Sequence, residues 1–113
     1  MTDINLEIER DLTDIGVNPV FYFPESFNEL PVVTFYNLAE KGHFSMDNTE
    51  AITYDAVQID VWDRHGDTVG RLALRITEGL TEKGWAREFA GDMPPDESGV
   101  YHRTMRFSKI FND

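Results

Sequence analysis

The sequence contains no cysteine. Without thiols the chain has no disulfide framework, no thiolate metal ligands and no cysteine nucleophile. It also lacks an uninterrupted apolar run long enough to cross a bilayer, and its acidic first residues lack the basic region and apolar stretch of a signal peptide. We therefore expect a protein with no membrane span and no export signal, suited to a reducing cytoplasm.

Basic residues are scarce: 10 Lys and Arg stand against 21 Asp and Glu, which gives a net charge of −11. Such a chain repels phosphate backbones and anionic lipids, so we expect neither sequence-specific nucleic-acid binding nor membrane binding. The charge is uneven, with net −10 over residues 1–62 and net −1 over residues 63–113. This asymmetry fits either head-to-tail contact between copies or ordinary acidic solubility.

Motifs for catalysis or cofactor binding are also missing. The three histidines, at 43, 65 and 102, form no pair spaced for one helix face, and the sequence has no nucleophile elbow, phosphate loop or dinucleotide fingerprint. Asp55 and Asp60 are separated by an odd number of positions on one predicted strand, so they point to opposite faces. The sequence therefore predicts no enzyme and no catalytic, cofactor-binding or metal-binding residue.

Two amphipathic helices are predicted, over residues 2–15 and over residues 67–83, the second beginning at 67 or 68. Their apolar stripes recur every three or four positions, at Ile4, Ile8, Leu12 and Ile15 and at Val69, Leu72, Ala73, Ile76 and Leu80. Gly16 and Gly84 are expected to end them in the left-handed conformation. Gly70 and Gly79 interrupt the second helix, which we attribute to close approach of that helix to a sheet.

Strands are predicted at residues 20–23, 32–38, 52–62, 85–91 and 100–107, with loops at 41–49 and 93–99. At 113 residues and 41% apolar content the chain forms one domain with one core. The order of elements predicts an α+β fold: a single antiparallel sheet of about four to five strands with two helices packed against it. The proline-containing 93–99 loop is either an arm that becomes ordered on assembly or a plain solvated loop.

Aromatic residues are predicted on the polar faces of strands. By alternation Trp62 lies opposite Val57, Ile59 and Val61, and one of the neighbours Phe35 and Tyr36 faces away from the core. Two interpretations remain open. Either helices cover both faces of the sheet, or these aromatics belong to a subunit interface, where Trp, Tyr and Phe are enriched.

Three segments of the chain carry distinctive runs of aromatic and apolar residues. Residues 21–36 (FYFPESFNELPVVTFY) contain the pattern aromatic-Pro-x-x-Phe-x-x-Leu-Pro, and residues 54–62 read YDAVQIDVW. The first segment resembles a signature of small tail-completion proteins of long-tailed bacteriophages, and the second resembles the central strand of that family. Residues 84–89 (GWAREF) and 100–107 (VYHRTMRF) resemble its closing hairpin. The matches follow the family's order and spacing from about Val20 to Phe107.

The resemblance implies a single tail-completion-like domain over residues 1–113 and a sheet with helices against it. It implies a structural protein of the virion neck, assembled in the host cytoplasm as a homo-oligomeric ring, a hexamer in such proteins. Its partners would be the tail-tube protein and the head connector protein. Both family roles stay open: terminating the tail tube, or joining the tail to the head. The family has no catalytic residues, so none is carried over.

A ring needs two different surfaces on each subunit. We predict a sheet edge with Tyr36 and Trp62 on one surface, and Arg71, Arg75 or Arg103 on the other. An acidic lumen would let DNA pass without tight phosphate contacts. The alternatives are an acidic monomeric adaptor or inhibitor that binds a host partner, and a small hydrolase or metabolite-binding domain.

Overall fold

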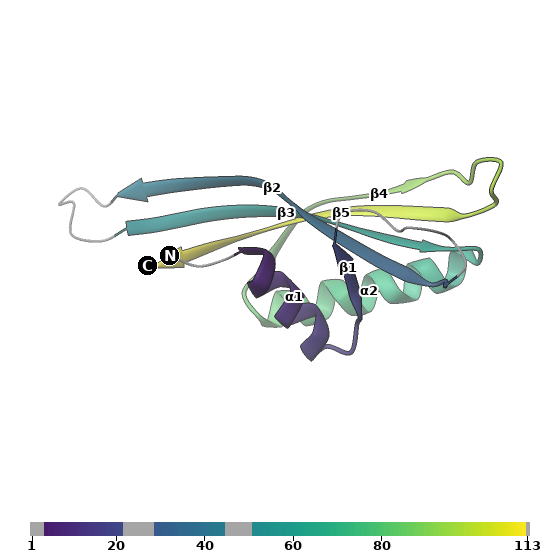
Figure 1. Ribbon diagram of the computed structural model, residues 1–113, viewed down its shortest axis with the longest axis horizontal. Coiled ribbons are helices and arrows are strands. Elements are labelled where there is room, and N and C mark those ends of the chain that lie inside the picture. The colour runs from purple at the N-terminus through teal and green to yellow at the C-terminus, as the bar shows by residue number, and fades with distance from the viewer. Residues whose placement is uncertain (1–3, 22–28, 45–50, 113) are drawn as a thin grey trace.

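The computed structural model describes residues 4–21, 29–44 and 51–112, with the side chains of 4–21, 29–38 and 54–111. Two helices and five strands follow one another in the order shown in Figure 1: α1 (Ile4–Asp14), β1 (Pro19–Phe21), β2 (Val32–Phe44), β3 (Ala51–Asp63), α2 (Gly66–Glu82), β4 (Ala86–Met93) and β5 (Tyr101–Asn112). The predicted α+β class, with two helices against one five-stranded sheet, is confirmed.

The strands lie in the order β1-β2-β3-β5-β4. Neighbours from β2 to β4 pair antiparallel, as predicted, whereas β1 pairs parallel with β2, from Pro19 opposite Val33 to Phe21 opposite Phe35. Ten residues, 22–31, connect these two strands. A connection of that length brings the chain back to the start of β1, whereas an antiparallel hairpin needs only a short turn.

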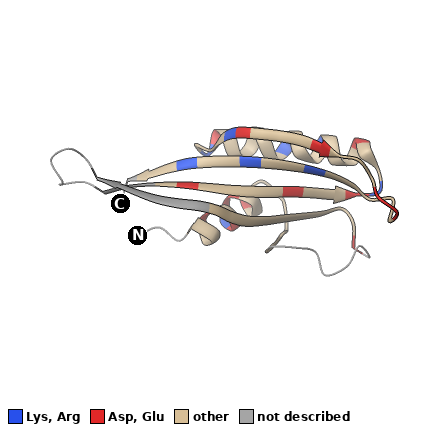
Figure 2. Ribbon diagram, turned by 90° about the horizontal axis from the view of Figure 1, so that it is seen from above, with Lys and Arg blue, Asp and Glu red and all other residues tan. Residues whose placement is uncertain are grey.

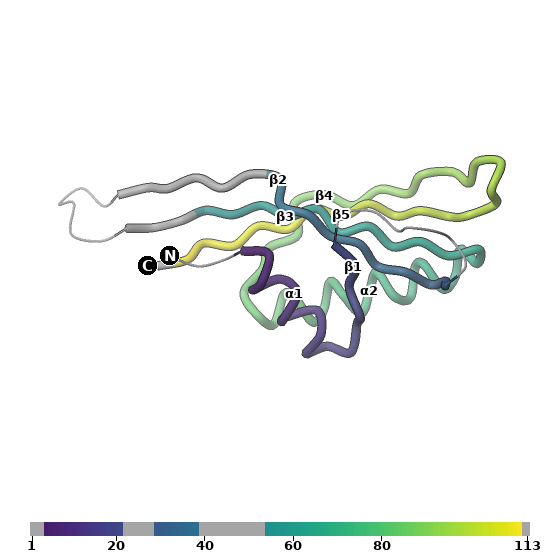
Figure 3. The backbone as a smooth tube through the Cα atoms, viewed as in Figure 1, coloured from purple at the N-terminus to yellow at the C-terminus, as the bar shows by residue number. Residues whose placement is uncertain are grey.

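Two strands, β2 and β5, are longer than predicted by several residues. β2 continues to Phe44, so residues 41–44 belong to the strand and not to the predicted 41–49 loop, whose residues 45–50 lie outside the described part. β5 continues from 107 to Asn112 because β3 begins at Ala51 and supplies its partners, as far as Ile52 opposite Asn112. β5 extends beyond the helices, as the tube in Figure 3 shows.

Both helices lie on one face of the sheet, so the interpretation in which helices cover both faces is wrong for the described residues (Figure 1). The core forms between this face and the helices. It includes Val57, Ile59 and Val61 of β3, as their alternation predicted, together with Phe35, Met105 and Phe107 from the neighbouring strands. The helix stripes also pack here, with Ile8, Leu12, Ile76 and Leu80 fully buried.

Glycines end both helices in the predicted way, since Gly16 has φ +85° and Gly84 has φ +95°. The explanation for the two glycines inside α2 was wrong. A Cβ at Gly79 would lie 2.6 Å from Ile15 Cγ2, so this glycine allows α1, and not the sheet, to approach closely. A Cβ at Gly70 would meet nothing within 4 Å.

Charge is divided between the two central strands. β3 carries three carboxylates (Asp55, Asp60, Asp63) and no cation, whereas its partner β5 carries three cations (Arg103, Arg106, Lys109) and no carboxylate. Figure 2 shows these two series side by side. Asp55 stands directly opposite Lys109 in the ladder. Opposite charges across paired strands favour this pairing over alternatives.

Candidate functional site

One face of the sheet carries no helix from the described part of the chain, and we call it the open face (Figure 1). Side chains alternate along a strand, so every second residue of β2, β3 and β5 points to it. The register places these residues in rows across the three strands. They include Thr34, Tyr36, Gln58, Asp60, Trp62, His102, Thr104 and Arg106.

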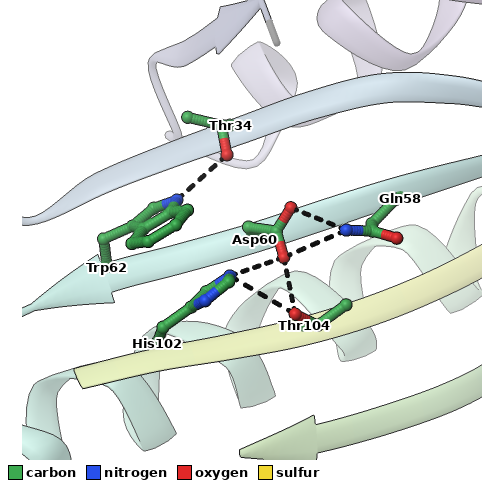
Figure 4. A network of polar contacts seen from close by, with 6 residues as sticks. All are labelled: Thr34, Gln58, Asp60, Trp62, His102 and Thr104. Carbon is green, nitrogen blue, oxygen red and sulfur yellow. Dashed lines mark hydrogen bonds and ion pairs between the residues drawn. The ribbon is translucent and has the colours of Figure 1, made fainter. Parts of the chain in front are cut away.

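Asp60 is the centre of a polar network on the open face (Figure 4). Its side chain is only 2% exposed, and its Oδ1 lies 2.7 Å from both His102 Nε2 and Thr104 Oγ1. Gln58 Nε2 donates to the other oxygen, Oδ2, at 3.1 Å. Because a buried carboxylate is costly without donors, these contacts explain how an acidic side chain can lie in the middle of the sheet.

Trp62 extends this network toward β2. Its indole stacks on the imidazole of His102, with centroids 3.6 Å apart and planes 8° apart, and its Nε1 donates to Thr34 Oγ1 at 3.0 Å. Thr34 is fully buried although it faces away from the helices. The predicted orientation of Trp62, on the polar face of its strand, is confirmed, and the indole is held there by two neighbours.

The geometry of this network fits a structural role and differs from that of a catalytic triad. In a nucleophilic triad the histidine bridges the other two groups, with one ring nitrogen on the carboxylate and the other on the hydroxyl. Here the same nitrogen of His102 lies near both Asp60 and Thr104, at 2.7 and 3.3 Å, and the Thr104 hydroxyl donates to Asp60 directly. The three side chains therefore hold one another in place, and the histidine does not activate the hydroxyl.

A second group of contacts lies between β4 and β5. Glu88 Oε1 accepts a hydrogen bond from Ser108 Oγ at 2.7 Å, and both carboxylate oxygens of Glu88 lie 3.2 Å from the hydroxyl of Tyr54. Arg106 lies over the ring of Phe89 at 5.6 Å. Thus side chains of β3 and β5 surround the carboxylate of Asp60, two hydroxyls donate to that of Glu88, and the open face presents aromatic rings and an arginine.

The five predicted interface residues fall on two sides of the molecule. Tyr36 and Trp62 lie on the open face, whereas Arg71 and Arg75 belong to α2 and Arg103 points to the side of the sheet that carries the helices. The structure does not bring the aromatics and the arginines together within one chain.

The three arginines differ in what they contact. Arg75 donates through Nη2 and Nε to the carbonyl oxygen of Ile15, at 2.8 and 3.2 Å, and so ties α2 to the end of α1. Arg71 pairs with Asp67 one turn earlier on the same helix, with both side chains about three-quarters exposed. Arg103 Nη1 lies 3.6 Å from Asp92 of β4.

The loop at 94–100 is held by its own hydrogen bonds. Asp96 accepts hydrogen bonds from the hydroxyl and the backbone N–H of Ser98, and Arg64 donates to the Ser98 carbonyl at 2.7 Å. Gly99 completes the turn with φ +73°. The conformation of this loop is therefore set within a single chain.

Sequence reasoning missed the connection between the residues of the network. From the sequence His102 had no catalytic or metal-binding role, and Thr34, Gln58 and Thr104 were not singled out. Their only signal was the alternation of polar residues on three strands. Asp55 and Asp60 lie on opposite faces of β3, as predicted. His65 is exposed before α2, and the side chain of His43 lies outside the described part.

No group of three or more His, Asp or Glu side chains is placed to hold a metal ion within 4–21, 29–38 and 54–111. Neither helix of the described part is long and apolar enough to cross a membrane.

Comparison with known proteins gives a structural likeness only. No family model matches the sequence, and no curated protein matches it. Among solved structures, 29 chains are similar. One of them belongs to the virion of a native gene transfer agent (GTA) particle, with a TM-score of 0.65 and 13% identity over 91% of this chain and 84% of that chain. At this identity the likeness shows a shared fold.

Proposed function

We propose that this chain is a structural protein of a tailed-phage virion, and that it forms a ring with copies of itself at the head-proximal end of the tail. The ring either terminates the tail tube or joins it to the head connector. The observation that carries the proposal is the likeness to a virion chain across nearly the whole length, 91% of this chain and 84% of that one. The three segments that resemble tail-completion proteins support the same assignment.

The two edges of the sheet are suited to a head-to-tail contact. β4 forms one edge, and at the other edge β1 pairs with β2 only from Val33 to Phe35, so the outer side of β2 beyond Tyr36 pairs with no strand among the described residues. Unpaired edge strands present backbone donors and acceptors that can pair with another chain. Two different edges on one subunit meet the requirement for a heterologous contact.

Strand direction predicts how these edges would meet. β2 and β5 run one way, and β3 and β4 run the other. A rotation about an axis along the strands preserves these directions, so β4 of one copy and β2 of the next would lie antiparallel. The antiparallel arrangement of strands within one sheet would then continue from copy to copy around the ring.

Exposed apolar side chains lie at both edges. Phe89 and Met93 of β4 are 50% and 53% exposed, and Val20, Phe21 and Leu38 at the opposite edge are 38%, 55% and 39% exposed. At the proposed contact the two aromatic residues Tyr36 and Trp62 lie on the open face of the sheet. The three arginines, Arg71, Arg75 and Arg103, lie on the face that carries the helices. The aromatics and the arginines would thus contribute to two faces of one interface.

The proposed function is that of a non-enzymatic scaffold, assembled in the host cytoplasm and present in the virion neck with the tail-tube and connector proteins. Carboxylates outnumber cations by 11. An excess of negative charge at the lumen would let DNA pass, because like charges prevent tight phosphate contacts.

Electron microscopy of particles assembled without this protein tests the proposal. Overlong tails would identify a tail terminator, whereas tails of normal length that are not attached to heads would identify a joining protein. Complete, infectious particles would contradict a neck function. If the purified chain instead captured one host protein in a one-to-one complex without self-assembly, the acidic adaptor would be the better account.

A further inference from the structure

Two hollows flank the first half of α2. One, of about 450 Å³, lies between α2 and the β4–β5 hairpin, and we call it the hairpin hollow; Gly66, Gly70, Asp92, Met93 and Pro94 are among its lining residues. The other, of about 280 Å³, lies beside the start of β2, and we call it the Pro31 hollow; its lining residues are Pro31, Thr68, Arg71, Leu72 and Arg75. The helix residues of the two sets lie on different sides of α2, so the hollows face the two opposite edges of the sheet.

The two hollows lie at the same level along the strands. The register from β4 through β5 and β3 to β2 places Met93 in one row with Val32. Pro94, which follows Met93, is therefore level with Pro31, which precedes Val32. A rotation about an axis along the strands leaves the level of every residue unchanged, so it brings the hairpin hollow of one copy beside the Pro31 hollow of the next.

Apolar groups are available on both sides of such a contact. In the hairpin hollow Met93 is 53% exposed and Tyr101 is 41% exposed, and Gly70 presents no side chain to it. In the Pro31 hollow Pro31 is exposed and Leu72 is partly buried. Exposed apolar groups that line a concave surface are typical of a site that another molecule covers.

The exposed charges of the two hollows are opposite. Asp92 of the hairpin hollow and Arg71 of the Pro31 hollow each have a side chain that is 74% exposed. Within the chain they take part in ion pairs of 3.6 Å with Arg103 and 3.4 Å with Asp67, and exposed pairs of this kind hold their side chains weakly. A guanidinium has five N–H donors, so Arg71 can bind a second carboxylate as well as that of Asp67.

We infer that the hairpin hollow of one copy receives the Pro31 hollow's side of a second copy, with Arg71 paired to Asp92 across the contact. The inference rests on the proposed ring, and it names the residues that meet on the helix-bearing side. Pro31 of one copy packs on Met93 and Pro94 of its neighbour. Because every copy carries both hollows, at opposite edges, the same contact repeats from copy to copy as a heterologous interface requires.

A charge exchange tests the contact. Arg71→Glu should weaken self-association by at least about ten-fold in sedimentation, because it sets a carboxylate against Asp92 of the neighbour, and adding Asp92→Lys should restore assembly. Arg10→Glu is the matched control: it makes the same change at a 63% exposed arginine of α1 outside both hollows, and it should assemble as the natural chain does. Urea denaturation of each variant checks that the fold is intact.

Introduced cysteines give an independent readout, because the natural chain has none. The double variant Arg71→Cys with Asp92→Cys should form disulfides between copies on oxidation and give a ladder of covalent oligomers on a non-reducing gel. The control, Arg10→Cys with Asp92→Cys, should give no ladder.

The outcomes separate this contact from the ring itself. If the natural chain forms rings, the ladder is absent and Arg71→Glu assembles no worse than Arg10→Glu, the contact is wrong and the ring stands. Equal weakening by the two charge reversals, again without a ladder, would assign the effect to overall charge and also contradict the contact. If the natural chain stays monomeric with and without the tail-tube protein, the proposed ring is wrong and the contact falls with it.

Discussion

The indole of Trp62 lies flat on the imidazole of His102, and the same imidazole contacts the buried carboxylate of Asp60 at 2.7 Å. These three side chains come from strand positions up to 42 residues apart in the chain, and they form one unit on the open face. An aromatic side chain fixed in this way presents a surface without a large loss of conformational entropy on binding. The network therefore holds the Trp62 side chain in one orientation on the open face.

Removing the imidazole should destabilise the fold. In His102→Ala, Asp60 loses a hydrogen-bonded neighbour and Trp62 loses its stacking partner, so we expect the free energy of unfolding to fall by about 1–3 kcal/mol. Urea denaturation followed by tryptophan fluorescence measures this change. His65→Ala is the control, because His65 is exposed and its side chain makes no capping hydrogen bond, and it should change stability little. Equal effects of the two variants would contradict a structural role for the network.

The two glycines inside α2 should respond in opposite ways to the same substitution. Gly70→Ala should stabilise the chain by about 0.5–1 kcal/mol, because alanine favours the helix and its Cβ meets open space. Gly79→Ala should destabilise it by about 1–3 kcal/mol, because the new methyl group would overlap Ile15. Thermal or urea unfolding of both variants shows directly whether each substitution stabilises or destabilises the chain. A loss of stability in both would show that Gly70, like Gly79, is packed against a neighbouring group.

Much of the fold follows from local pattern. The apolar stripes of α1 and α2 and the alternation of Val57, Ile59 and Val61 predicted which surfaces are buried, because each depends only on spacing along one element. The same alternation placed Trp62 on the opposite face.

What local pattern could not supply was the pairing between distant segments. The three residues of β1 carry no signal of strand direction, so its parallel pairing was missed. Gln58, Asp60 and Thr104 resemble any solvated strand face until the register of β3 and β5 brings them together. Gly79 likewise depends on the position of α1, which is fixed by packing and not by the sequence near residue 79.

The hydrogen bonds from Arg75 to the Ile15 carbonyl predict that two arginines of α2 contribute differently to stability. Arg75→Ala removes two hydrogen bonds to the Ile15 carbonyl, and we expect a loss of about 1–2 kcal/mol of stability. Arg71→Ala removes only an exposed ion pair within the helix and should cost no more than about 0.5 kcal/mol. Chemical denaturation of the two variants under identical conditions measures the difference. Comparable losses would show that the contact with Ile15 contributes little.

The turn at Asp96 should depend on pH. Hydrogen bonds from the Ser98 hydroxyl and then from its backbone N–H lower the pKa of Asp96 below its ordinary value of 3.8. A lowered pKa in the folded chain means that the ionised form stabilises the turn above the ordinary value, and that this contribution is lost as the pH falls through the lowered pKa. Chemical shifts of the Ser98 and Gly99 amides, followed by NMR between neutral pH and about pH 2, should report that transition.

Asp96→Asn is the matched control for this titration. It removes the ionisable group, so the same two amide shifts should no longer follow a titration at that position. A titration of unchanged midpoint in the variant would assign the transition to another carboxylate and contradict the role given to Asp96.

The central claim is that each chain presents two different surfaces to identical neighbours. Native mass spectrometry of the purified protein over a wide concentration range, alone and with tail-tube protein, tests it most directly. The account predicts a closed assembly of a single size, with a mass that is one fixed multiple of 13.0 kDa. A chain that remains at 13.0 kDa under all of these conditions, or a dimer that does not grow further, would contradict it.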